Sequence, residues 1–218
     1  MRGFFTFIIF LVYAQIAHAQ AQNPLTDRLV SPLFEPALAY SDISMQEDCT
    51  ERPLRPPKYH ACRDSGQIYA NALTNATAKG QPLMVIFGFD SCPGCKAMHK
   101  QVFDPKHPTT HADIVKYLSK PALNAYILSE QSLKISVVRI HAKSEHGRAL
   151  AKSLGILKDG GRLRSPLLLY VNSQTGQHYV APPTLAPYCD WGADFAAGLE
   201  EIGVVQTGQP YVARKRCG

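Results

Sequence analysis

The chain has 218 residues, of which 45% are hydrophobic, and it carries a formal net charge of +6. This length fits one domain with an extension better than two full domains, since a domain has roughly 100–200 residues. The positive residues are scattered, with one dense run at 214–216, and no basic stripe alternates with aromatic residues. The composition therefore argues against nucleic acid as a partner.

The first 19 residues have the three-part pattern of a secretory signal. Arg2 gives a positive start, residues 4–14 are apolar with one exception, and Ala17 and Ala19 are small residues where signal peptidase reads. We predict cleavage after Ala19 and a periplasmic or secreted protein. The apolar run is shorter than the about 20 residues of a spanning helix, so no stable membrane span is expected after cleavage. An uncleaved anchor extending through Ile16 is the alternative.

Six cysteines in an exported chain can form persistent disulfides. Cys92 and Cys95 are a local pair. From spacing alone we expect structural bridges Cys49–Cys62 and Cys189–Cys217, although other pairings remain open.

Residues 20–63 are expected to form an irregular extension, because prolines recur from Pro24 to Pro57 and interrupt helices and central strands. From residue 64 the pattern changes to alternating helices and strands. The segment 83–87 is wholly apolar, as in a strand buried on both faces. Residues 119–132 fit no clear pattern. The predicted elements are helices at 64–80, 92–103, 114–118, 145–154 and 194–202, and strands at 83–87, 134–140, 166–171 and 177–181. This order predicts an α/β fold with a parallel part and a terminal antiparallel hairpin.

The segment 90–95, Asp-Ser-Cys-Pro-Gly-Cys, places two cysteines at the start of a predicted helix. Unpaired N–H groups at a helix N-terminus stabilise a thiolate, which is the nucleophile in disulfide exchange. Cys92 is expected to be exposed and to attack, while Cys95 lies one turn inward and resolves the mixed disulfide. Nearby Lys96, His99 and Lys100 are candidates to add positive potential, whereas Asp90 opposes it, and the sequence does not give the sign of the sum.

A CxxC pair also has two other interpretations. It supplies half of many zinc sites, with His99, His107 and His111 downstream as possible further ligands. It can also be an inert structural bridge, although so short a loop restrains the unfolded chain little.

The sequence resembles the thioredoxin-like superfamily, particularly its exported members, over about residues 64–206. The resemblance is carried by residues 79–87 before the cysteines, by 92–98 (CPGCKAM) with 102–105 (VFDP), and by 154–156 with 165–171 (SPLLLYV). It implies a thioredoxin-like mixed sheet with flanking helices over 64–206, followed by a tail at 207–218.

The resemblance also implies a function and further site residues. Pro166 is expected to be a cis-proline facing the CxxC, and Ser165 is expected to offer its backbone to an extended substrate. The implied activity is thiol–disulfide exchange in the bacterial envelope, with protein thiol or disulfide substrates, a redox-recycling partner and no cofactor.

Two positions depart from the pattern. Many thioredoxins have Trp before the first cysteine, where this chain has Ser91, and many have a buried Asp six residues before it, where this chain has Ile86. The proton of the Cys95 thiol must therefore pass to water or to a group other than a buried Asp.

Two rival functions are a module that holds copper or zinc through Cys92, Cys95 and a histidine, and a redox-inactive adaptor of an envelope assembly.

Overall fold

The computed structural model describes residues 32–45, 58–104, 106, 109–128, 133–181 and 191–208. The predicted signal peptide, the predicted tail beyond residue 208, and Cys49, Cys189 and Cys217 lie outside these residues.

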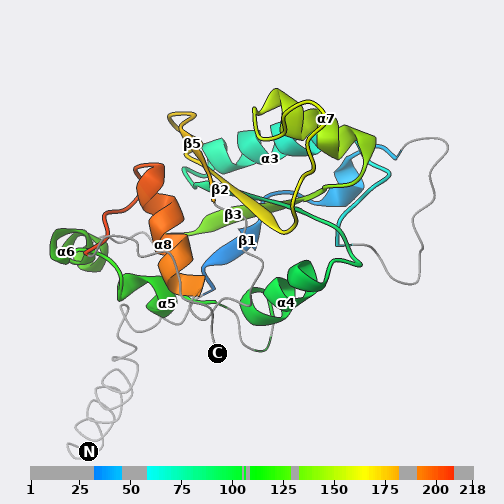
Figure 1. The fold of residues 1–218 in the computed structure, drawn as a ribbon. Coiled ribbons are helices and arrows are strands. Elements are labelled where there is room, and N and C mark those ends of the chain that lie inside the picture. Colours follow the sequence, from blue (N-terminus) through cyan, green and yellow to red (C-terminus); the bar gives the residue numbers. More distant parts are fainter. Residues whose placement is uncertain are drawn as a thin grey trace, which may run out of the picture.

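Five strands form one mixed sheet in the order β1-β3-β2-β4-β5 (Figure 1). The strands are β1 (Phe34–Pro36), β2 (Leu83–Gly88), β3 (Ile135–His141), β4 (Leu167–Val171) and β5 (His178–Val180). β1, β3 and β2 are parallel, whereas β4 runs antiparallel to both β2 and β5. The predicted α/β fold with a terminal hairpin is confirmed.

Helices cover both faces of the sheet (Figure 1). α3 (Ser65–Ala78) and α7 (Glu145–Ser153) lie on one face, and α4 (Pro93–Val102), α5 (Ala112–Val115) and α8 (Trp191–Glu201) lie on the other. α6 (Lys120–Leu128) occupies part of the segment that fits no clear sequence pattern, and a 3-10 helix, η1, spans Tyr40–Asp42.

All six residues of β2 are buried, which explains the uninterrupted apolar run. Successive side chains point to opposite faces of a strand. Val85 and Phe87 therefore pack with α3 and α7, while Met84 and Ile86 pack on the α4 and α8 side. β2 thus separates two apolar clusters and leads directly into the CPGC segment.

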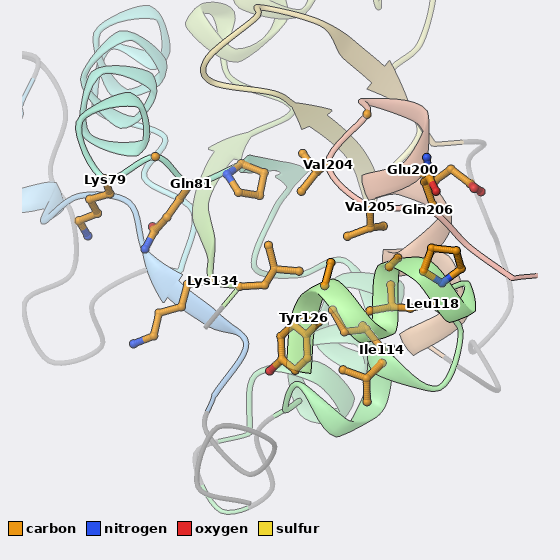
Figure 2. A pocket seen from close by; sticks show the side chains of 18 residues that line it. Lys79, Gln81, Ile114, Leu118, Tyr126, Lys134, Glu200, Val204, Val205 and Gln206 are labelled. Carbon is orange, nitrogen blue, oxygen red and sulfur yellow. The ribbon is translucent and has the colours of Figure 1, made fainter. Parts of the chain in front are cut away.

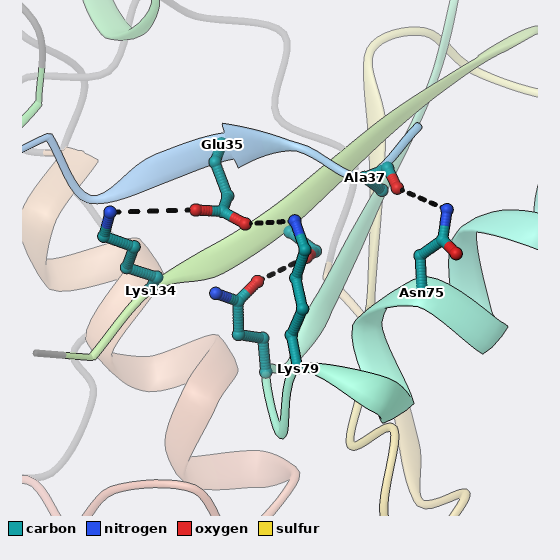
Figure 3. Close-up of polar contacts among 7 residues, drawn as sticks. Glu35, Ala37, Asn75, Lys79 and Lys134 are labelled. Carbon is teal, nitrogen blue, oxygen red and sulfur yellow. Dashed lines mark hydrogen bonds and ion pairs between the residues drawn. The ribbon is translucent and has the colours of Figure 1, made fainter. Parts of the chain in front are cut away.

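The N-terminal extension is not irregular throughout, because Phe34–Pro36 forms the edge strand β1 beside β3. Proline is tolerated on an edge strand, because the outer side of such a strand makes no hydrogen bonds to a neighbouring strand. The side chain of Glu35 forms ion pairs with Lys79 at 2.5 Å and with Lys134 at 3.8 Å, and Asn75 donates to the Ala37 carbonyl at 3.1 Å (Figure 3). These contacts attach the extension to the domain.

Candidate active site

The CPGC segment forms the first turn of α4. Cys92 is the N-cap, with extended backbone angles (φ −70°, ψ 119°), and Pro93 is the first helical residue. Proline is favoured there because its missing N–H would have no helical partner. The Cys95 N–H donates to Cys92 Sγ at 3.2 Å, so a sulfur atom fills the place that a hydroxyl or carboxylate oxygen takes at most helix starts.

Both cysteines are free thiols and both are buried, with Cys92 3% exposed and Cys95 1% exposed. The expectation that Cys92 is exposed is therefore wrong. Its sulfur is covered because the segment before β4 packs over the start of α4, where the Cys92 thiol donates to the Ser165 carbonyl oxygen at 3.6 Å.

Ser165 and Pro166 lie beside the cysteines, about seventy positions away in sequence. The Ser165–Pro166 peptide bond is cis. A Cβ built on Gly94 would lie 3.0 Å from Cδ of Pro166 and 4.0 Å from the Ser165 carbonyl oxygen. The structure therefore brings together the four site residues that the sequence indicates.

Cys95 sits in an environment that favours the neutral thiol. Burial, together with a hydrogen bond to Cys92, raises the pKa of Cys95 to about 12, although hydrogen bonds from the Phe89 backbone and the Tyr59 side chain act in the opposite direction. Its proton must nevertheless leave before the sulfur can attack a mixed disulfide. Ile86 occupies the position of the buried Asp found in many thioredoxins and is wholly buried, so it offers no acceptor.

Sequence reasoning missed Tyr59, which lies directly beneath the site. Its side chain is 1% exposed and packs in the same buried cluster as Cys95, where it lowers the pKa of the Cys95 thiol, and its hydroxyl lies 3.2 Å from Nε2 of His99. Gly88 at the end of β2 makes room for the ring, since a Cβ there would lie 2.5 Å from a ring carbon of Tyr59. No periodic pattern marks Tyr59, because it belongs to the proline-rich segment before α3.

His99 is a neutral, buried residue rather than a source of positive potential. Burial, followed by the Arg139 guanidinium and the Lys58 ammonium, lowers its pKa to about 3. Its spacing four residues after Cys95 places both side chains on one face of α4, and this is the sequence signal that could have indicated their proximity.

The other candidate residues lie apart from this centre or outside the described chain. The His111 ring hydrogen-bonds the Leu133 carbonyl, and His107 is not described. Within the described segments, no group of three or more His, Cys, Asp or Glu side chains is placed to hold a metal ion. Cys62 is disulfide-bonded, and its partner lies outside the described residues.

A cavity of about 1220 Å³ lies at the other end of the sheet, where β2 and β3 begin (Figure 2). Apolar side chains from α5, α6 and the segment after α8 line it, including Ile114, Leu118, Val204 and Val205. It is separate from the cysteines, which follow the far end of β2.

A mixed sheet in which β1, β3 and β2 are parallel, with a CxxC pair at the start of the helix after β2, is the arrangement of a thioredoxin-like fold. Residues 69–153 match the model of a thioredoxin-like domain family, so this part of the chain is similar to thioredoxin-like domains.

Two solved structures are similar to the chain. One is a disulphide isomerase from Xylella fastidiosa Temecula1, with 19% identity over 72% of this chain and 93% of that chain and a TM-score of 0.38. The other is the oxidoreductase DsbH, with 15% identity over 75% of this chain and 98% of that chain and a TM-score of 0.35. No curated protein matches the chain. None of the helices in the described segments has the length and hydrophobicity that a bilayer span requires.

Proposed function

We propose that this protein is a thiol–disulfide oxidoreductase that acts on protein disulfides or dithiols in the bacterial envelope. The observation that carries the proposal is the pair of free thiols at the start of α4, with the Cys95 N–H on Cys92 Sγ and the Ser165 carbonyl alongside. The Cys95 N–H that donates to Cys92 Sγ lies in the first turn of α4, next to the attacking sulfur of the proposed exchange.

In the direction that reduces a substrate, the Cys92 thiolate attacks one sulfur of the substrate disulfide. A Cys92–substrate bond forms, the substrate S–S bond breaks, and the other substrate sulfur leaves and takes a proton. The Cys95 thiolate then attacks Cys92 Sγ, so the enzyme is oxidised to a Cys92–Cys95 disulfide and the second substrate sulfur leaves as a thiol. Ser165 and Pro166 position the substrate chain, and the reverse sequence oxidises a substrate dithiol.

A trapping experiment tests the exchange. Cys95→Ala removes the resolving thiol, so mixed disulfides with envelope proteins should accumulate on Cys92 and disappear on reduction. The matched control, Cys92→Ala, should trap nothing. An absence of mixed disulfides in the first variant, together with unchanged cellular function in Cys92→Ser, would reject the oxidoreductase and favour an adaptor role.

The reduction potential of the Cys92–Cys95 couple assigns the direction. A value near about −270 mV, like that of thioredoxin, indicates a reductase, whereas a value near about −120 mV, like that of DsbA, indicates an oxidant. Export is tested separately by N-terminal sequencing of the mature protein, for which we expect Gln20 as the first residue.

A further inference from the structure

Cys95 is the group whose chemistry the fold makes most difficult, because burial disfavours its thiolate. Its neighbours are Cys92, the Phe89 backbone and Tyr59, of which the last two lower the pKa of the Cys95 thiol, and Tyr59 packs in the same buried cluster. Cys92 is occupied in the mixed disulfide when Cys95 must act. Of the two remaining groups, the Tyr59 hydroxyl is the one carried by a side chain, so it can be removed by substitution.

Tyr59 is fixed in place from two directions. Its ring fills the space above Gly88, and its hydroxyl meets Nε2 of His99 at 3.2 Å, with the two rings nearly perpendicular at 74° and their centroids 5.6 Å apart. His99 is itself buried on α4. The hydroxyl therefore contacts the His99 ring within the buried cluster that also contains Cys95.

The protonation states of these groups determine which way the hydroxyl points. Burial raises the pKa of Tyr59, so Tyr59 keeps its proton at neutral pH. The cationic groups facing His99 are Arg139 on β3 and Lys58 before α3, and together with burial they keep its ring neutral. A neutral ring with hydrogen on Nε2 can donate to the Tyr59 oxygen, which leaves the single Tyr59 hydrogen free to point at sulfur.

We propose that Tyr59 is a catalytic residue that donates a hydrogen bond to the Cys95 thiolate as it forms, and that His99 is the positioning residue that directs the Tyr59 hydroxyl towards that sulfur. This assignment rests on the proposed exchange function. The Cys95 proton passes to solvent, the Cys95 sulfur forms a bond with Cys92 Sγ, and the departing substrate sulfur takes a proton from solvent. A fixed donor aimed at a developing negative charge lowers the barrier because it needs no reorganisation during the step.

The test isolates the resolution step. The full exported protein is methylthiolated on Cys92 with methyl methanethiosulfonate at acidic pH, where Cys95 stays protonated. A pH jump then starts attack by Cys95, and acid quenching with mass spectrometry follows loss of the methylthio group between pH 6 and 10. The variants are Tyr59→Phe, His99→Leu and His99→Gln. Tyr40→Phe is the matched control, because it removes the hydroxyl of another, partly buried tyrosine, one that contacts the Arg139 backbone.

A hydrogen bond to a charged group is worth about 1.5–3 kcal/mol, which corresponds to roughly a 10- to 100-fold change in rate. We expect Tyr59→Phe to slow resolution by that factor at neutral pH and to move the rise of its pH profile to higher pH. His99→Leu should slow resolution as well, whereas His99→Gln, whose amide can donate to the Tyr59 oxygen, should recover most of the rate. Tyr40→Phe should resolve at the wild-type rate.

The inference is overturned if Tyr59→Phe resolves at the wild-type rate across this pH range. It is also overturned if His99→Gln is as slow as His99→Leu, because His99 would then not act by donating a hydrogen bond to the Tyr59 oxygen. Should Tyr59→Phe unfold, the two His99 variants decide by the same readout. Failure of the proposed function looks different, because Cys92 would then trap no envelope protein in the Cys95→Ala variant, whatever residue occupies position 59.

Discussion

Gly94 and Pro166 lie so close together that a Cβ on Gly94 would be 3.0 Å from the Cδ of Pro166. The residue between the two cysteines is thus in contact with the segment that covers Cys92. A side chain at position 94 would press on that segment and on the Ser165 carbonyl beside the Cys92 sulfur. Gly94 therefore allows the Ser165–Pro166 segment to lie close to the start of α4.

Gly94→Ala should slow attack by Cys92 on a disulfide several-fold while leaving the fold intact. The added methyl group displaces Pro166 by a few tenths of an ångström, whereas alanine stabilises a helix relative to glycine by about 0.5–1 kcal/mol. Attack rates in the Cys95→Ala background and urea unfolding measure the two effects. Lys96→Ala, an exposed change on the same helix, is the control. Equal attack rates for Gly94→Ala and its parent would contradict this prediction.

The stability of the wild type should fall between neutral and acidic pH because of His99. The pKa of His99 lies near 3 in the folded protein and its ordinary value is 6.5, so the unfolded chain takes up a proton that the folded protein excludes. This stabilisation is complete above pH 6.5 and is lost as the pH falls towards 3, by about 2 kcal/mol at pH 5. Urea unfolding at pH 7.5 and pH 5 measures it.

His99→Gln cannot titrate and is the matched variant for that measurement. It should lose about 2 kcal/mol less between the two pH values than the wild type does, because the change in stability caused by the other ionisable groups is common to both proteins. Equal losses of stability in the two proteins would mean that His99 has the same pKa in the folded and unfolded states.

Gly88→Ala should act on Cys95 through Tyr59. Its Cβ would lie 2.5 Å from the Tyr59 ring, so the ring must shift, at a cost of about 1–3 kcal/mol in stability for overpacking. The shift moves the hydroxyl away from sulfur and should slow resolution in the pH-jump assay. In the Tyr59→Phe background the same substitution should add little further slowing, because no hydroxyl remains to be displaced. Fully additive slowing would argue against the route through Tyr59.

Gly198→Ala should destabilise the packing of α8 on β4. A Cβ at position 198 would lie 2.5 Å from two ring atoms of Tyr170, which predicts a loss of about 1–3 kcal/mol on urea unfolding. Tyr170→Leu shortens the opposing side chain, so the double variant should be less destabilised than the sum of the single changes. If the losses in stability of the two single variants simply add in the double variant, contact with the Tyr170 ring is not the cause of the destabilisation.

The sequence predicts well those features that depend on local pattern. The apolar run at 83–87 identifies β2, which extends one residue further to Gly88. Met98 and Val102 are four residues apart on α4, as residues on one face of a helix are, and each is 1% exposed. These residues follow helix and strand periodicity, which needs no knowledge of distant segments.

Features that depend on long-range packing were not predictable. β1 is a three-residue strand containing Pro36, and its identity comes only from pairing with β3, about a hundred residues later. The burial of Cys92 depends on Ser165 and Pro166, and the place of Tyr59 depends on the space at Gly88. In each case the deciding partner lies in another part of the chain.

The disulfide at Cys62 lies three residues after Tyr59, so a second thiol–disulfide couple holds the segment that reaches beneath the reactive pair. A reductant strong enough to open that bond would release this segment as well as reduce Cys92 and Cys95. Redox titrations of the protein should therefore follow the Cys92–Cys95 couple and the Cys62 thiol separately, by thiol labelling and mass spectrometry of the labelled peptides. Two separate transitions would mean that the Cys92–Cys95 couple and the Cys62 disulfide have different midpoint potentials. The protein would then be active only where the conditions reduce Cys92 and Cys95 but leave the Cys62 disulfide intact.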